Sequence, residues 1–418
     1  MLYDAVIELN KKKIIDSIVV LLAGAGISQL LVVALSPILT RFFTPEDLGV
    51  YGSYVTLIST LVVFSTGRYE FVLLLPNTKV NSHSVYDYTL RRTFKFTIVS
   101  TVFISALAFL IQDLKIDGSG AIYFIPLGTY LLSLFNLRTQ WSIAQLNYTV
   151  VSKGRFFQSL SVPLLSILLG LFVGSSYLAL VLCDCIGRLI GARLLGSPNR
   201  STQNTAPPAD AALIHERYRK FSLFEQITAF LSISSLQLPI VLMPVIFDSK
   251  VAGYYFIVYR VVTAPVALIS NAMVDVFKNL ALSEIESRGS CTNAMSKTVL
   301  YLFLIGFLPC LLLGYYGQML FIFAFGEEWG IAGIYAQILA PSLLLRLIAC
   351  PVAFVLQLRE KVTTNMLIYL LFFIITCASL FAGNYMKSAE ELVVLLSAGA
   401  CIFYCTQLYF AYRYSKAI

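Results

Sequence analysis

The amino-acid sequence predicts an all-α polytopic membrane protein with about twelve transmembrane helices, in two related six-helix lobes around a central cavity. Hydrophobic residues make up 58% of the 418 positions and charged residues only 12%, a balance that is rare in soluble globular proteins. Apolar runs of about 18 or more residues recur along the whole chain, and each can cross roughly 30 Å of hydrocarbon. No polar block is long enough to form a separate soluble domain.

Twelve apolar stretches define the expected helices in order along the chain. The first half is expected to span at 14–39, 48–66 (with the helix able to run on to 75), 94–112, 121–142, 156–174 and 176–195. The second half is expected to span at 220–247, 251–277, 298–324, 331–356, 363–383 and 391–412. The basic residues Lys11–Lys13 imitate the start of a signal peptide, but the apolar run after them is too long. An uncleaved first helix is therefore the better interpretation.

The longest polar segment, 196–219, predicts a cytoplasmic linker between an N-terminal lobe (1–195) and a C-terminal lobe (220–418). The lobes resemble each other at three places in the same order. The matching pairs are Ser28 to Pro37 with Ser235 to Pro244, Leu48 to Tyr51 with Ala252 to Tyr255, and 120–146 with 332–358. Because each lobe has an even number of spans, a duplication predicts parallel copies about an axis along the membrane normal.

The distribution of Lys and Arg predicts that both termini are cytoplasmic. With the N-terminus inside, 21 of the 30 basic residues fall in inner loops and tails, including Arg91, Arg92 and Lys95. Four fall in outer loops, namely Arg41, Lys115, Lys250 and Lys387. The net charge of +8 is then mostly a topology signal, and nucleic-acid binding does not follow from it.

Arg260 and Arg346 lie inside apolar stretches, close to the expected membrane midplane. An arginine at that depth costs at least about 2.5–3.5 kcal/mol, so it normally faces a lumen or marks a substrate path. Neither has an acidic residue within one helical turn, which excludes a purely local ion pair. Because a guanidinium group can bind phosphate oxygens through two parallel hydrogen bonds, both are candidates for binding an anionic substrate.

Other charges lie at defined depths in the expected helices. Asp184 and Arg188 are one turn apart and can pair along one face. Arg188 is also a lumen candidate, as is Arg138, which lies nearer the inner side on the helix equivalent to that of Arg346. The charges expected near the inner mouth are Arg68, Glu70, Glu225 and Asp275. For Asp184–Arg188 and Arg68–Glu70 the alternative is a salt bridge that only locks helices together.

The first and seventh spans carry polar residues and prolines at equivalent positions. The first span carries Gln29 and Pro37, and the seventh carries Gln237 and Pro244. Proline allows a helix to kink, so these positions are candidates for gates. Alternatively, the polar side chains only form hydrogen bonds between helices.

The sequence lacks the motifs of covalent chemistry, including a P-loop, GxSxG and HExxH, and it has no outer loop large enough for an active site. An enzyme is therefore disfavoured. The eight cysteines lie almost all within spans and contain no CxxC, and His83 and His215 fall in polar inner loops. Disulfides, a metal site and a cofactor are not expected.

Several segments resemble bacterial polysaccharide (O-antigen type) flippases of the multidrug/oligosaccharidyl-lipid/polysaccharide exporter superfamily. The opening signature is Ser36-Pro-Ile-Leu-Thr-Arg-Phe-Phe-Thr-Pro-Glu-Asp-Leu-Gly-Val-Tyr-Gly52, followed by Arg68 to Pro76. In the second half, Ala252 to Pro265, Phe325 to Tyr335 and Leu339 to Pro341 resemble the same family. The resemblance implies a V-shaped pair of six-helix lobes and a cationic lumen. It further implies transport of an isoprenoid-pyrophosphate-linked oligosaccharide from the inner to the outer leaflet of the bacterial inner membrane.

The expected partners are therefore an undecaprenyl-pyrophosphate-type oligosaccharide, membrane lipid and other polysaccharide assembly proteins, with no nucleic acid. Coupling to H+ or Na+ is also considered, with Asp184 as the best candidate because the protonation of a mid-depth carboxylate responds to access from either side. A multidrug-type exporter using cation antiport is the main alternative, but acidic residues should then dominate the lumen. A membrane-embedded glycan ligase or polymerase would need a large outer loop.

Overall fold

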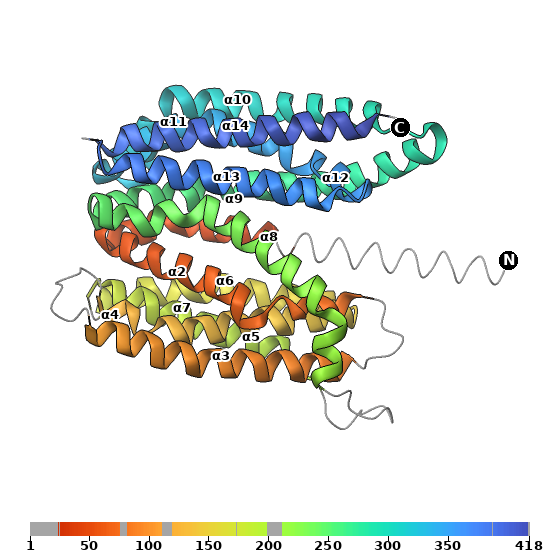
Figure 1. Ribbon diagram of the computed structural model, residues 1–418. Coiled ribbons are helices and arrows are strands. Elements are labelled where there is room, and N and C mark those ends of the chain that lie inside the picture. The colour runs from red at the N-terminus through yellow and green to blue at the C-terminus, as the bar shows by residue number, and fades with distance from the viewer. Residues whose placement is uncertain are drawn as a thin grey trace. The chain divides into compact units, whose positions relative to one another are not determined.

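The computed structural model describes residue 24 and the ranges 26–75, 82–110, 119–172, 174–198, 211–386 and 388–416. Within these ranges the chain forms helices joined by turns and short irregular segments, and none of the described residues forms a β-strand (Figure 1). The described residues do not include Lys11–Lys13, residues 14–23 and 25 of the expected first span, Lys115, residues 199–210 of the expected linker or Lys387.

Each of the twelve expected spans coincides with a helix. The first six are represented by Gly26–Phe42, α2 (Pro45–Thr66), α3 (Ser82–Leu110), α5 (Ile125–Ala144), α6 (Tyr148–Phe172) and α7 (Tyr177–Leu195). The second six are α8 (Ala211–Ile246), α9 (Ser249–Arg288), α10 (Thr292–Phe325), α11 (Gly330–Val352), α13 (Val362–Gly383) and α14 (Ala389–Ser415). Among the described residues, nine helices are long and apolar enough to cross a membrane, so the protein is a multi-pass membrane protein.

Several helices extend well beyond the apolar stretches that predicted them. α3 begins at Ser82, α8 begins at Ala211, and α9 continues to Arg288. Hydropathy marks the part of a helix that contacts lipid, whereas the backbone hydrogen bonds continue into the polar flanks. Two expectations are corrected. Arg91, Arg92 and Lys95 lie on α3 and not in a loop, and residues 211–219 of the expected linker are helical.

Three expected spans are interrupted. The second span does not run on to 75 as one α-helix, because Gly67 and Arg68 adopt left-handed conformations (φ 62° and 60°) before the 3-10 helix η1 (Tyr69–Leu74). The fourth divides into α4 (Ser119–Ile122) and α5, where Pro126 occupies the first turn of α5. The tenth divides into α11 and α12 (Phe354–Leu358), shortly after Pro351.

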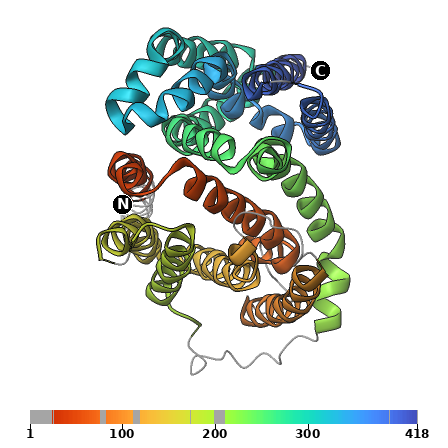
Figure 2. The ribbon, with the colours of Figure 1, turned by 90° about the vertical axis from the view of Figure 1, so that its left-hand side faces the viewer.

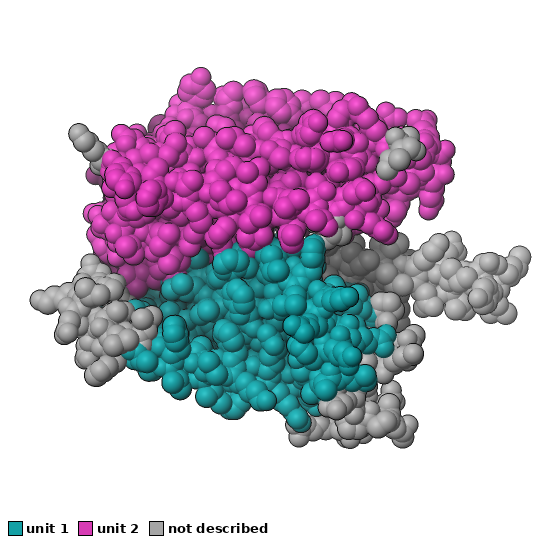
Figure 3. All heavy atoms as spheres, in the orientation of Figure 1, with its two compact units in different colours: residues 1–35, 54–230 teal, residues 36–53, 231–418 magenta. Residues whose placement is uncertain are grey.

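The chain forms two compact units, coloured separately in Figure 3. Unit 1 contains residues 1–35 and 54–230, and unit 2 contains residues 36–53 and 231–418. Both α2 and α8 therefore contribute residues to both units. This division differs from the lobes expected at 1–195 and 220–418, since it follows packing and not chain order.

The packing inside each unit repeats, which agrees with two related lobes. In unit 1, α5 packs against α3 and α7, and α6 packs against α7. In unit 2, α11 packs against α10 and α14, and α13 packs against α14. Figure 2 shows many of these helices close to end-on. The helices α5 and α11 overlap the matched segments 120–146 and 332–358, and each packs against the corresponding neighbours of its own unit. The lobes are therefore related by structure as well as by sequence.

Two segments matched by the repeat meet at one end of unit 2. A Cβ atom added to Gly49 would lie 1.9 Å from the carbonyl oxygen of Ser249, and one added to Gly253 would lie 1.8 Å from that of Pro45. The first turns of α2 and α9 therefore cross with their backbones in contact, as small residues allow between membrane helices.

The segment Phe325 to Tyr335, which also carries the resemblance, packs at the same end of unit 2. Lys250 at the start of α9 pairs with Glu46 on α2 at 3.8 Å and with Glu328 at 4.0 Å. The ring of Tyr254 contacts the buried Trp329 edge-on, with the centroids 5.9 Å apart. These segments of the family signature therefore have a structural role in assembling unit 2.

Candidate functional site

Arg346 lines a small cavity inside unit 2 that combines apolar side chains with hydroxyl groups. The cavity has a volume of about 50 Å³ and is surrounded by α8, α9, α11, α13 and α14. A water molecule needs roughly 10–15 Å³ of such space, so the cavity has room for a few waters. Its polar lining consists of Ser235, Tyr255, Tyr259, Thr263, Ser342, Arg346, Thr376 and Tyr404. These positions come from five helices that are far apart in sequence.

The cavity holds a positive charge without a lining carboxylate. Arg346 is half-buried and has Tyr259, Tyr404 and Cys350 as electrostatic neighbours. No Asp or Glu is among the described residues that line the cavity. A cation removed from water is stabilised by a counter-charge or by hydrogen bonds, and here neutral hydroxyl groups surround it. The arrangement can accept a water or an anionic oxygen.

Arg260 lies on α9, which packs against α11. It is half-buried, and its Cζ atom lies 5.9 Å from the centre of the Phe256 ring on the same helix. Within the described parts of the chain it forms no salt bridge, as its sequence neighbourhood predicts. It does not line the Arg346 cavity. The structure therefore places both arginines in unit 2, on neighbouring helices but in different surroundings.

Gln237 reaches the edge of the Arg346 cavity. Its Nε2 atom lies 3.5 Å from the Tyr259 hydroxyl, which links α8 to α9. Pro239, one of two prolines inside α8, also lines the cavity, and the second, Pro244, is half-buried further along the helix. Gln237, which is expected at a gate, therefore contacts a residue that lines the cavity but does not line it itself, and its role in gating stays a prediction.

Asp184 and Arg188 form the predicted ion pair in the core of unit 1. Arg188 donates from Nε to the Asp184 carboxylate at 2.5 Å, and both residues are buried. The next residue, Cys185, lies 3.3 Å from the hydroxyl of Tyr54 on α2. Cys183 and Cys185 are buried, as expected for packing positions. The pair lies on one face of α7 and brings two opposite charges together in an apolar interior.

Arg138 holds the end of α7. Its Nη1 atom donates to the backbone carbonyl of Ala192 at 2.7 Å, in the last turn of that helix. The last carbonyls of a helix lack partners within it, and a cation near them is favourable. The observed contact joins α5 to α7, and the lumen role suggested for Arg138 stays a prediction.

The turn after α2 contains a second charged pair. Arg68 and Glu70 lie 3.7 Å apart, and the Glu70 side chain is 1% exposed. Neither carboxylate oxygen of Glu70 has a hydrogen bond from the described residues. Burial raises the pKa of Glu70 above its ordinary value, and the neighbouring Arg68 only partly opposes this. Ser222 on α8 fixes the turn by donating to the Gly67 carbonyl at 2.6 Å.

The remaining predicted positions lie apart from these clusters. Glu225 is half-buried on α8, and Asp275 is exposed on α9 with Lys278 at 3.4 Å. Gln29 is exposed and Pro37 half-buried in the helix over Gly26–Phe42. Their roles in the inner mouth or in gating stay predictions. In the described ranges, no group of three or more His, Cys, Asp or Glu could hold a metal ion.

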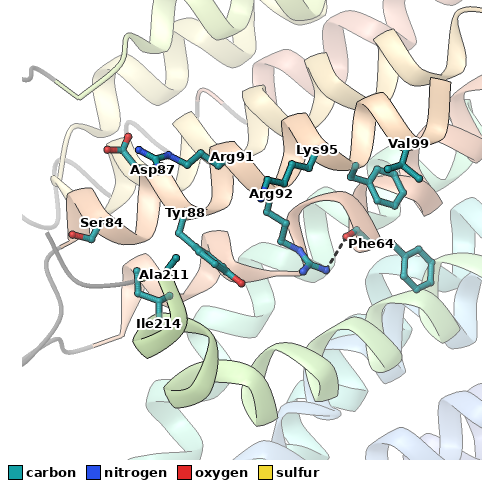
Figure 4. Close-up of a pocket in the computed structure, with 11 residues that line it drawn as sticks. Phe64, Ser84, Asp87, Tyr88, Arg91, Arg92, Lys95, Val99, Ala211 and Ile214 are labelled. Atoms are coloured by element: carbon teal, nitrogen blue, oxygen red, sulfur yellow. Dashed lines mark hydrogen bonds between the residues drawn. The ribbon is translucent and has the colours of Figure 1, made fainter. Parts of the chain in front are cut away.

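A groove on unit 1 was missed by the sequence analysis. It is lined by Arg91, Arg92 and Lys95 of α3 together with Phe64 of α2 and the start of α8 (Figure 4). These cations were assigned to a loop because the apolar stretch begins only near residue 94. The spacing of Arg91, Lys95 and Val99 at four-residue intervals is the signal that could have placed them on one helical face.

The fold belongs to a known class of membrane protein. A structure described as the lipid II flippase MurJ in an inward closed conformation has 10% identity and a TM-score of 0.70, covering 94% of this chain and 87% of that chain. An outward-facing multidrug resistance MATE family transporter of the MOP superfamily has 11% identity and a TM-score of 0.62, with 94% of each chain covered. This chain therefore has the MOP transporter fold.

A further match and the family model refine this. A MOP superfamily transporter from Pyrococcus furiosus, for which a reversed polarity of the binding pocket is described as suggesting a different function, has 10% identity and a TM-score of 0.58, with 94% of each chain covered. No curated protein matches this sequence. The model of a family described as "Polysaccharide biosynthesis protein" matches residues 38–332, and the chain belongs to that family.

Proposed function

We propose that the protein is a flippase that moves a polyprenyl-pyrophosphate-linked oligosaccharide, of the O-antigen or capsule type, from the inner to the outer leaflet by alternating access. Its membership of a polysaccharide biosynthesis family and its likeness to MurJ support a lipid-linked sugar as the substrate. The proposed location is the bacterial inner membrane with both termini in the cytoplasm. The protein carries out no covalent step and needs no cofactor for the movement.

The observation that carries the proposal is the pair of arginines in unit 2. Arg260 is half-buried in mid-helix, and Arg346 lines a cavity whose described lining contains no carboxylate. The substrate has a lipid tail that can stay in the bilayer and a doubly charged pyrophosphate that cannot cross hydrocarbon unaided. Cations held at mid-depth lower the free energy of that charge inside the membrane, and a guanidinium group matches phosphate oxygens.

A multidrug-type exporter on the same fold is the second candidate. The structural similarity to a MATE family transporter shows that this fold also occurs in multidrug exporters. Such proteins move organic cations, which acidic side chains would stabilise. The cations in unit 2 favour an anionic substrate over a cationic one.

The test uses single substitutions at these arginines in a strain that depends on this protein for its surface glycan. Arg260→Ala and Arg346→Ala should leave membrane insertion and abundance intact but sharply reduce the glycan. The Arg→Lys variants should restore it only in part, because an ammonium group cannot form two parallel hydrogen bonds to a phosphate. Normal glycan levels in both Ala variants and in the double variant would overturn the proposal.

We further propose that movement in one direction is coupled to a H+ or Na+ gradient through Asp184. Its carboxylate is buried beside Arg188 at mid-helix, where a change of access can change its protonation. Asp184→Asn should remove the response of transport to an imposed pH or sodium gradient. A wild-type protein that ignores both gradients, or a variant that still responds, would leave Asp184 with a structural role only.

A further inference from the structure

A groove at one end of unit 1 combines cations with apolar side chains. It has a volume of about 590 Å³ and lies between α3, Phe64 of α2 and the first turns of α8 (Figure 4). This volume falls within the range of roughly 300–1,000 Å³ that is usual for small-molecule sites. The groove is separate from Arg260, Arg346 and Asp184, which lie on other helices.

The charged side of the groove is positive. Arg91, Arg92 and Lys95 line it against one acidic residue, Asp87, which leaves an excess of two positive charges. Arg91 and Lys95 are exposed, and neither forms a salt bridge with any residue that the structure describes. Their charges are therefore available to an anion.

Arg92 and Tyr88 form a fixed wall of the groove. Arg92 Nη2 donates to the Phe64 carbonyl at 3.3 Å, and its Cζ atom lies 5.8 Å from the centre of the Tyr69 ring. The Tyr88 hydroxyl lies 3.3 Å from Nδ1 of His215 on α8. Because these contacts join α3 to its neighbours in unit 1, the groove is held open by packed elements and is not a chance gap between loops.

The cationic face continues directly into an apolar one. Lys95 and Val99 follow Arg91 at four-residue intervals, so they form one stripe along α3. Val99, Val102 and Phe103 are each 66% exposed. At 1.5 Å per residue, the stripe extends about 12 Å from Lys95, near the middle of α3, to Phe103 in its C-terminal part. A water-soluble anion would use only the cations, whereas this stripe offers a surface for hydrocarbon.

We propose that this groove binds an anionic phospholipid of the bilayer, in the leaflet that the charge distribution predicts to be cytoplasmic. The lipid phosphate contacts Arg91 and Lys95, and an acyl chain lies along Val99 and Phe103. Basic pockets between membrane helices on the cytoplasmic side favour anionic headgroups. Ala211 and Ile214 of α8 also line the groove opposite α3. This lipid is bound and not transported.

The test measures lipid binding to the purified full-length protein by native mass spectrometry. The two probes are dioleoyl phosphatidylglycerol and dioleoyl phosphatidylcholine, which share acyl chains and differ in net charge. The wild-type protein should prefer phosphatidylglycerol. The double substitution Arg91→Ala/Lys95→Ala should lower the affinity for phosphatidylglycerol on the order of 30-fold, because each Lys or Arg contributes a factor of about five near an anionic surface. Binding of phosphatidylcholine should weaken much less, because its choline cation offsets the charge of the phosphate that both lipids carry.

Two controls make the result specific. Arg288→Ala/Lys297→Ala removes two exposed cations from unit 2 and should keep the wild-type preference. Val99→Ser should lower the affinity for both lipids, because it removes apolar contact and no charge. An unchanged preference in Arg91→Ala/Lys95→Ala, or an equal loss in the unit 2 control, would overturn the proposal. Displacement of the lipid by glycerol phosphate at equal affinity would also overturn it, since a soluble anion would then be the ligand.

Because Arg260 and Arg346 are unchanged in these variants, the outcome is independent of the proposed transport. A protein that moves no glycan would still bind the phospholipid, and a protein without this lipid site would still have its cationic cavity. The two proposals therefore fail separately.

Discussion

Asp184 and Arg188 are charged residues buried in the interior of unit 1, at a mutual distance of 2.5 Å. Two ions moved out of water lose several kcal/mol of solvation each, and mutual attraction and hydrogen bonds offset that loss only when the geometry is good. Removing one partner leaves an uncompensated charge, which is more harmful than removing both. The pair is therefore sensitive to single substitutions.

We expect Asp184→Asn to destabilise the protein by about 3–5 kcal/mol, the usual effect of breaking a buried pair. The double substitution Asp184→Asn/Arg188→Met should be closer to wild type, because it removes the guanidinium charge together with its carboxylate. Thermal unfolding of the purified variants, followed by tryptophan fluorescence or size-exclusion chromatography, measures both. A double variant as unstable as the single one would contradict this account.

Glu70 predicts a dependence of stability on pH. Burial raises its pKa in the folded protein above the unfolded value, so the folded state binds the proton more tightly. Stability should then fall as the pH rises from about 4.5 through the raised folded pKa. Glu70→Gln should be more stable than wild type at neutral pH and should lose this dependence.

The exposed Glu286 on α9 supplies the matched control, as Glu286→Gln removes the same charge from a solvated position. Unfolding temperatures of the wild type, Glu70→Gln and Glu286→Gln are measured between pH 4.5 and 7.5, and only Glu70→Gln should lose the dependence on pH. A Glu70→Gln variant that retains the wild-type dependence would show that another group is responsible.

The charged sites differ in how far the sequence could predict them. The Asp184–Arg188 pair follows from a four-residue spacing on one helix, which sequence alone contains. The contact of Arg138 with the Ala192 carbonyl depends on how α5 packs against α7, which no local pattern encodes. The hydroxyl groups around Arg346 come from α8, α9, α13 and α14 as well, so only the tertiary fold brings them together.

At the scale of elements, the crossing of α2 and α9 in unit 2 explains two glycines of the family signature. Gly49 and Gly253 occupy equivalent positions in the two halves, and each faces backbone atoms of the other helix. A methyl group there would collide with backbone, which cannot rotate away as a side chain could. The helices would have to move apart.

Gly49→Ala and Gly253→Ala should therefore each destabilise the protein, despite the higher helix propensity of alanine. Gly314 on α10 is the matched control, because an added Cβ there meets nothing within 4 Å. Gly314→Ala should be neutral or stabilising, by up to about 1 kcal/mol. Thermal unfolding of the three variants decides the matter, and equal effects at all three positions would contradict close helix contact.

The positions of the helices were predictable, but their ends were less so. Apolar stretches located all twelve spans, because the bilayer imposes a length on each helix. The polar continuations of α3, α8 and α9 carry no hydropathy signal. The break after α2 depends on Gly67, where an added Cβ would lie 2.6 Å from Arg92 Nε, a contact that becomes visible only in three dimensions.

At the scale of the whole molecule, repeated packing produces two units of similar construction with unequal charge. The buried charges of α7 in unit 1 are paired, whereas Arg260 and Arg346 in unit 2 have no acidic partner among the described residues. A duplicated fold supplies the scaffold, and divergence of single residues supplies the chemistry. The sequence repeats predicted the scaffold, whereas this difference between the halves becomes visible only in the structure.

The most direct measurement of the central claim is translocation of a purified polyprenyl-pyrophosphate-linked oligosaccharide in proteoliposomes that contain only this protein. Lectin accessibility of the sugar on the opposite leaflet reports the movement. We predict translocation by the wild-type protein, with losses on the order of tenfold or more in Arg260→Ala and Arg346→Ala, since a charged contact to phosphate is worth about 1.5–3 kcal/mol. Arg288→Ala should behave as wild type. Equal translocation by the wild type, both arginine variants and protein-free liposomes would contradict the claim.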